Sequence, residues 1–188
     1  MSSIEWQTSE GYALDSAQTA HRPILVDYYN SKSIGCQQME AVTYPADEVV
    51  RYVNNYLIPL RINVNEDLLH ENFHHIWTPT IAVLDFNGNE VQRTIGFLDP
   101  DDFIATMHLG IAKVRMDAKQ YDTAMIPLKN LLEVFQKSYA VPEAIYFMGV
   151  ILYKQRNAPA KLKEAYERLL TDYPDSKWTK RASPYRLL

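Results

Sequence analysis

The first half of the chain alternates short apolar runs with amphipathic stretches, the pattern expected of strands that alternate with helices. Apolar residues are nearly continuous over 24–29 and 81–86, as in buried central strands. A further strand is expected over 57–64. Because Asn87-Gly88 is a hairpin signal, 90–95 should pair back on the strand before it.

Helices are expected between these strands, where the apolar period changes and start signals such as Ser9 occur. Pro45 should interrupt one of them, because proline cannot donate the backbone hydrogen bond of a helix interior. The expected helices of the first half are 9–20, 34–44, 47–55 and 66–75.

From residue 100 onward the apolar period is helical and no strand signal occurs. Pro127 lies beyond the first turn of the second helix, so we expect a kink there or a later helix start. Residues 131–138 resemble 169–176 at an offset of 38 residues, in the range of helical-pair repeats. The expected helices are 100–118, 121–137, 141–156, 160–173 and a short one over 176–182.

The composition is that of a globular chain, since 47% of its 188 residues are hydrophobic and 22% are charged. The net charge of −4 argues against a nucleic-acid partner. No apolar run approaches the ~18 residues of a membrane span, so no membrane association is expected. Cys36 is the only cysteine and residues 1–15 carry no secretory signal. We therefore expect a cytoplasmic protein without an internal disulfide.

The strand over 24–29 and the residues after it resemble the active-site region of thioredoxin-fold proteins. The Ser-Ile-Gly-Cys sequence at 33–36 falls on the Cys-x-x-Cys position of that family, and 78–80 (Thr-Pro-Thr) falls on the element whose proline is cis. Asn87-Gly88 falls on the hairpin and Gly96 on the glycine before the last helix. The resemblance implies an α/β thioredoxin fold, a central mixed sheet flanked by helices.

The second half resembles tetratricopeptide repeats. Residues 142–153 fit the first helix of a repeat, with Gly149 at the small position where helices touch. The two resemblances imply a thioredoxin-like domain over 1–116 and an all-α, tetratricopeptide-like extension over 117–188. One continuous helix, 100–118, is expected to serve both parts.

The order of these two parts, with Ser-x-x-Cys in the first, resembles the architecture of the bacterial chaperedoxins. Those proteins hold unfolding clients and can form mixed disulfides. The resemblance implies protein or peptide clients, and a chaperone as a further partner.

Ser33 stands at the exposed helix start where dithiol exchange requires an attacking thiolate. A hydroxyl is a far weaker acid than a thiol, and the sequence shows no adjacent base that could activate it. We therefore expect a protein-binding or chaperone-type module with little or no dithiol oxidoreductase activity.

Two interpretations of Cys36 remain open. It is either a small buried apolar residue, or a monothiol that forms a reversible mixed disulfide with a client or glutathione. Asp27 stands where many thioredoxin-fold proteins have a buried acid, so it is either the acceptor of the Cys36 proton or a core acid. Ser33 has a separate interpretation, because in some thioredoxin-fold transferases a serine at its place stabilises the glutathione thiolate. The candidate redox-site residues are Cys36, Ser33 and Asp27, and no cofactor is expected apart from glutathione.

A cis proline beside the 33–36 loop would present the backbone of the preceding residue to an extended peptide or to glutathione, which would pair with it as an added strand. That surface needs no thiol. The candidate binding residues are Ile34, Gly35, Trp77, Thr78 and Pro79.

Three histidines, at 70, 74 and 75, suggest a metal site at first sight. Two of them, His70 and His74, are four residues apart on one predicted helix face. Glu66 and Glu71 lie nearby, but no cysteine stands at ligand spacing from them, and two histidines rarely suffice to hold zinc. We therefore expect a solvated helix and no metal.

Overall fold

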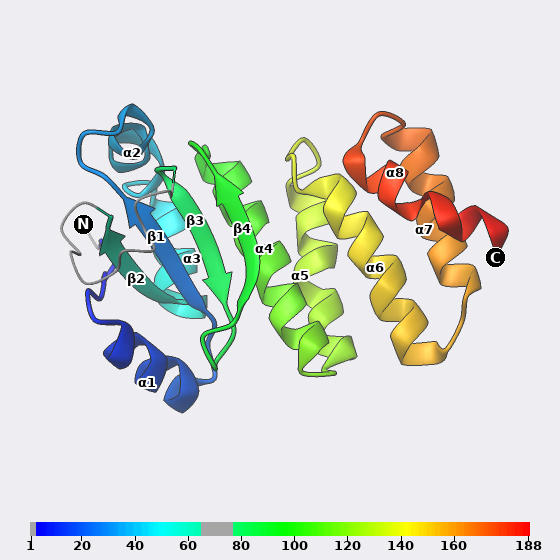
Figure 1. The fold of residues 1–188 in the computed structure, drawn as a ribbon, viewed down its shortest axis with the longest axis horizontal. Coiled ribbons are helices and arrows are strands. Elements are labelled where there is room, and N and C mark those ends of the chain that lie inside the picture. Colours follow the sequence, from blue (N-terminus) through cyan, green and yellow to red (C-terminus); the bar gives the residue numbers. More distant parts are fainter. Residues whose placement is uncertain (1–2, 65–76) are drawn as a thin grey trace. The chain divides into compact units, whose positions relative to one another are not determined.

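The computed structural model describes residues 3–64 and 77–188 (Figure 1). The chain divides into two compact units, Met1–Gly110 and Ile111–Leu188. The division falls within helix α4 (Pro100–Asp117), as does the boundary expected after residue 116.

The first unit is built on a four-stranded sheet with the order β2-β1-β3-β4 (Figure 1). β1 runs parallel to β2 and antiparallel to β3, and β3 pairs antiparallel with β4. The sheet is therefore mixed, as predicted. The strands are β1 (Ile24–Tyr29), β2 (Ile58–Asn63), β3 (Thr80–Leu84) and β4 (Glu90–Ile95).

The outer edge of β2 is paired with the segment before the first helix. The Gln7 N–H donates to the Pro59 carbonyl at 2.8 Å, and the Arg61 N–H donates to the Gln7 carbonyl at 2.8 Å. These bonds form an isolated parallel bridge between Gln7 and Leu60. This bridge covers backbone groups that an edge strand would otherwise leave unpaired.

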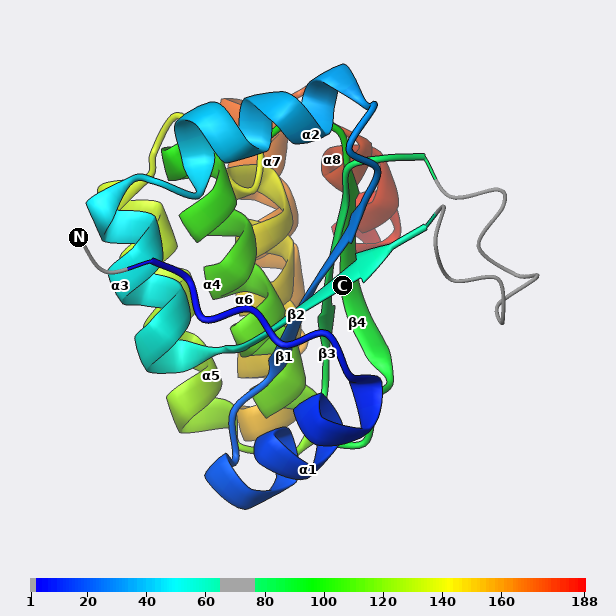
Figure 2. The same ribbon diagram turned by 90° about the vertical axis from the view of Figure 1, so that its left-hand side faces the viewer.

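Helices cover both faces of the sheet (Figure 2). α1 (Glu10–Ala20) buries Ala13 against the face that carries Val26. α3 (Asp47–Tyr56) and the first part of α4 lie on the other side. There α4 approaches β3 so closely that a Cβ added at Gly110 would lie 2.6 Å from the Val83 side chain.

The helix predicted over 34–44 forms, but its second half is not α-helical. α2 (Ile34–Gln38) gives way to a π-helical turn, η1 (Met39–Thr43). The backbone of Leu98 bonds both ends of this turn, because its N–H donates to the Met39 sulfur at 3.4 Å and its carbonyl accepts from the Thr43 hydroxyl. These bonds tie the turn to the segment before α4, and π-helical turns are frequent at functional sites.

The second unit is helical throughout, as predicted. α6 and α7 pack closely at Gly149, where an added Cβ would lie 2.5 Å from the Cβ of Ala165. The likeness to tetratricopeptide repeats stays a prediction. The elements after α4 are α5 (Tyr121–Val134), α6 (Val141–Arg156), α7 (Ala160–Asp172), α8 (Lys177–Ala182) and the 3-10 turn η3 (Ser183–Leu187).

Pro127 lies inside α5, which begins at Tyr121, so the alternative of a later helix start is wrong. Proline has no N–H to donate to the carbonyl four residues earlier, that of Thr123. Arg115 supplies the missing donor, since its Nη1 lies 2.9 Å from the Thr123 oxygen. This bond satisfies the carbonyl that the proline leaves without its helical partner.

Candidate functional site

Ser33 links the start of α2 to the segment before β3. Its backbone has the extended conformation of a helix N-cap, with φ −75° and ψ 126°, but its side chain makes no capping bond. Instead, Ser33 Oγ donates a hydrogen bond to the carbonyl oxygen of Thr78 at 2.8 Å. The hydroxyl that we predicted to stand at the attacking position is therefore committed to the backbone of Thr78.

The Thr78–Pro79 peptide bond is cis, and glycines approach Pro79 from two sides. A Cβ added at Gly35 would lie 2.7 Å from Pro79 Cδ, so only glycine fits there without a shift. The Gly96 N–H donates to the Pro79 carbonyl at 2.9 Å. The structure thus brings four predicted site residues into one place, Ser33, Gly35, Thr78 and Pro79.

Two further predicted binding residues are exposed apolar side chains beside this contact. Ile34 follows Ser33 and is 75% exposed, and Trp77 precedes Thr78 and is 78% exposed. Large apolar side chains that remain this exposed are informative when they adjoin a candidate site. Both therefore suit contact with an apolar partner.

Cys36 is buried, with 3% of its surface exposed. The backbone N–H of Asn30 donates to its sulfur at 3.5 Å, which is within range for a weak sulfur acceptor. A thiol that reacts with a protein disulfide must be accessible to it. In this conformation the Cys36 sulfur is not presented for such an attack.

Asp27 is also buried, and its partner is Arg61. The two residues are opposite each other in the parallel register of β1 and β2, and Arg61 Nε lies 3.1 Å from Asp27 Oδ2. Burial, with 1% of Asp27 exposed, raises the pKa of its carboxyl to about 6, although the positive charge of Arg61 opposes the shift. The pKa of Asp27 therefore lies well above the usual range of an aspartate.

Arg61 is the site residue that the sequence did not reveal. Its guanidinium group also pairs with Glu40 of η1 and lies 4.2 Å from the centre of the Tyr29 ring, as in a cation–π contact. The available signal was a single cation inside the predicted strand 57–64, in which Asn63 is the only other polar residue. The observed partner of Asp27 is Arg61. The role of Asp27 as a proton acceptor for Cys36 stays a prediction.

The Ser33 bond also bears on the glutathione interpretation. A serine hydroxyl has one proton, and in the Ser33 side chain this proton is directed to Thr78. Donation to a glutathione thiolate would require this bond to break first. As placed here, Ser33 Oγ can accept a hydrogen bond from a ligand but has no second proton to donate.

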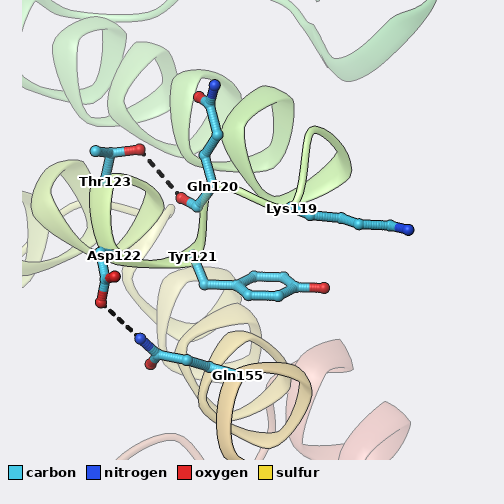
Figure 3. A pocket seen from close by; sticks show the side chains of 6 residues that line it. All are labelled: Lys119, Gln120, Tyr121, Asp122, Thr123 and Gln155. Carbon is cyan, nitrogen blue, oxygen red and sulfur yellow. Dashed lines mark hydrogen bonds between the residues drawn. The ribbon is translucent and has the colours of Figure 1, made fainter.

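A separate hollow of about 410 Å³ lies in the helical unit (Figure 3). Its polar groups partly pair with one another, because Gln155 donates to the Asp122 carboxylate at 2.6 Å and the Thr123 hydroxyl donates to the Gln120 carbonyl at 3.1 Å. No predicted site residue lies in it. The lining residues are Lys119, Gln120, Tyr121, Asp122, Thr123 and Gln155.

Two further expectations concern metal and membrane. The residues His70, His74 and His75, with the helix predicted over 66–75, lie outside the described residues. Within 3–64 and 77–188, none of the helices has the length and apolarity needed to cross a bilayer.

Comparison with known sequences shows that the first unit is similar to thioredoxin-like domains. A family model described as a thioredoxin-like domain matches residues 11–110. The thiol:disulfide interchange protein DsbD of Yersinia pestis (strain Pestoides F) is 30% identical over 94 residues, which make up 47% of this chain and 16% of that protein. The protein of the same name from Haemophilus influenzae (strain 86-028NP) is also 30% identical over 94 residues, again 16% of its length. The match therefore covers only a small part of these relatives.

Solved structures agree with this comparison at the level of the fold. A thioredoxin from Thermus thermophilus has a TM-score of 0.52 at 22% identity, and the match covers 61% of this chain and 91% of that one. A structure described as DsbH oxidoreductase has a TM-score of 0.50 at 14% identity, covering 58% of this chain and 85% of that one. The predicted thioredoxin fold is confirmed.

Proposed function

This chain belongs to the thioredoxin-like domain family, and from that premise we propose that it is a protein-binding or chaperone-type module with little or no dithiol exchange activity. The observation that carries the proposal is the Ser33–Thr78 hydrogen bond. It places a hydroxyl, already committed to the backbone, at the position from which a thiolate would attack.

The burial of Cys36 supports the same function. Dithiol exchange needs one thiolate that attacks and a second thiol that resolves the mixed disulfide. Cys36 is the only cysteine of the chain and it is buried. A chain with one shielded thiol has neither the attacking group nor a complete pair.

The proposed binding surface is the Trp77–Pro79 segment with Ile34 beside it. An extended client peptide would pair with the backbone of Thr78 as an added strand, while the exposed side chains of Ile34 and Trp77 contact its apolar residues. Helices α5–α8, if they act as tetratricopeptide-like repeats, would offer a second surface for a client or a chaperone partner. The proposed module works without a cofactor, in the cytoplasm.

Two measurements on the full chain test this function. The first is reduction of insulin in the presence of a thioredoxin-reducing system, where we expect no turnover above background. The second is binding of a reduced, carboxymethylated and therefore unfolded protein, where we expect binding that Cys36→Ala leaves intact. Insulin turnover that Cys36→Ser abolishes would contradict the proposal, as would failure of the unfolded probe to bind.

The second candidate function is a monothiol redox protein in which Cys36 forms a mixed disulfide with glutathione or a client. It is favoured by the similarity to proteins named for thiol:disulfide interchange. It requires a conformation that exposes the Cys36 sulfur. Mass spectrometry after mild oxidation with glutathione disulfide distinguishes the two functions. A glutathione adduct on Cys36 favours the second candidate function. An unmodified thiol that also resists alkylation in the folded protein rules that function out.

A further inference from the structure

The side chain of Ser33 occupies a backbone acceptor that strand pairing would use. Serine at a helix N-cap ordinarily accepts a hydrogen bond from the backbone N–H two or three residues later. Ser33 has the backbone conformation for that bond and does not make it. Its hydroxyl instead spans from the α2 loop to the Thr78 carbonyl, 45 residues further along the chain. The bond is therefore a tertiary one.

We infer that Ser33 acts as a latch on the proposed binding segment, Trp77–Pro79. By latch we mean that its hydroxyl competes with an incoming peptide for the Thr78 carbonyl. This inference rests on the proposed function and names the determinant of affinity within it. Thr78 lies just before β3, an inner strand of the sheet, so an added peptide would pair with the backbone of the Trp77–Pro79 segment and not with a sheet edge. In such pairing the backbone N–H groups of the peptide donate to backbone carbonyl oxygens. At Thr78 the Ser33 hydroxyl already donates to this oxygen, so a partner N–H must share or displace it.

The partner that fits is an extended peptide with a backbone N–H to offer at this position. A neutral intramolecular hydrogen bond contributes a net stability that is modest, because its groups bond to water when it breaks. Removal of the Ser33 hydroxyl should therefore tighten peptide binding roughly twofold to tenfold. Because the side chain makes no capping bond, its removal should not disturb the start of α2.

The chain offers a matched control in the same loop. Ser31 is exposed, and its carbonyl, not its hydroxyl, accepts a bond from the Gln37 side chain. Ser31→Ala removes a hydroxyl of the same kind from a site that does not face Thr78. Ser33→Thr keeps a hydroxyl at the latch and should bind like the wild type. The three variants Ser33→Ala, Ser33→Thr and Ser31→Ala therefore separate the latch from a general effect of serine removal.

The experiment uses ten-residue peptides tiled across the carboxymethylated unfolded probe, with affinities measured by fluorescence anisotropy on the full chain. The tightest peptide is then remade with one backbone nitrogen methylated at a time. We expect Ser33→Ala to bind the parent peptide more tightly than wild type, Ser31→Ala or Ser33→Thr do. One methylated position should abolish that gain, because it removes the N–H that takes the place of the Ser33 proton.

The outcomes distinguish this inference from the proposed function. If the wild type binds and Ser33→Ala binds equally or more weakly, the latch is overturned and the binding function stands. A gain that persists with every methylated peptide also overturns the latch, because the Thr78 carbonyl is then not the group in competition. If no variant binds the probe or its peptides, the proposed function fails and the latch fails with it.

Discussion

Arg61 and Asp27 form an ion pair between two adjacent parallel strands, with Nε 3.1 Å from Oδ2. The pair lies in the sheet directly before the loop that carries Ser33, because Asp27 is three residues from the start of that loop in β1. A buried carboxylate is tolerated when a cation accompanies it. Its protonation should therefore leave a measurable mark on the stability of the chain.

The free energy of unfolding of Asp27→Asn, relative to that of the wild type, should rise with pH. Burial raises the pKa of Asp27 from 3.8 to about 6, so the native state holds this proton more tightly than the unfolded state does. Between those values the native state binds more protons, and the stability contributed by Asp27 falls as pH rises. This contribution to stability falls by about 3 kcal/mol from a pH well below 4 to pH 7. The free energy of unfolding of Asp27→Asn minus that of the wild type, from urea unfolding, should rise by up to that amount. A difference that is the same at pH 4 and pH 7 would show that Asp27 is not shifted in this way.

Arg61→Met should destabilise the chain more at pH 7 than at pH 5. Methionine keeps an unbranched apolar side chain but leaves Asp27 buried without its cation, which costs about 3–5 kcal/mol when the carboxylate is ionised. Protonation of Asp27 at the lower pH removes the unpaired charge, so the loss becomes smaller. The double variant Asp27→Asn/Arg61→Met should recover most of the loss in urea unfolding at pH 7. No recovery would mean that Arg61 acts through its contacts with Glu40 and the Tyr29 ring.

Gly149→Ala should loosen the contact between α6 and α7. The added Cβ would lie 2.5 Å from the Ala165 Cβ, so the helices must separate, at a cost of about 1–3 kcal/mol. Gly11→Ala in α1 is the control, because its added Cβ finds only the Ser9 hydroxyl, at 3.9 Å, and alanine favours a helix over glycine by roughly 0.5–1 kcal/mol. Hydrogen–deuterium exchange of α6 and α7 peptides should quicken in the first variant and not in the second. Equal exchange rates in the two variants would contradict the prediction that α6 and α7 pack too closely at Gly149 to admit a Cβ.

The sequence allowed the strand and helix order to be predicted because each signal was local. The apolar runs marked β1 and β3, and Asn87-Gly88 marked the hairpin. The resemblance to thioredoxin-fold proteins placed Ser33 near Pro79. These features depend on neighbouring residues or on a family pattern. Local patterns of this kind carry most of the information about which elements form.

The sequence did not reveal features that depend on distant partners. Arg61 becomes the partner of Asp27 only through the register of two parallel strands. The π-helical turn is bonded to Leu98 at both ends. In α5, Arg115 donates to the Thr123 carbonyl, which Pro127 cannot do. No local pattern specifies such pairings, because each joins residues that only the folded chain brings together.

Ser33→Cys should create a dithiol reductase from a chain for which we propose little or no such activity. The substitution places a thiol at the helix start three residues before Cys36, and so completes a Cys-x-x-Cys pair in which Cys36 resolves the mixed disulfide. Reduction of insulin with dithiothreitol as the electron source should rise above the wild-type background. Ser33→Ala is the control for loss of the Thr78 bond and should show no turnover. The double variant Ser33→Cys/Cys36→Ser should trap mixed disulfides with insulin without turning over, because no thiol remains to resolve them. An inactive Ser33→Cys would show that a thiol at this position is not enough, and that the burial of Cys36 prevents exchange.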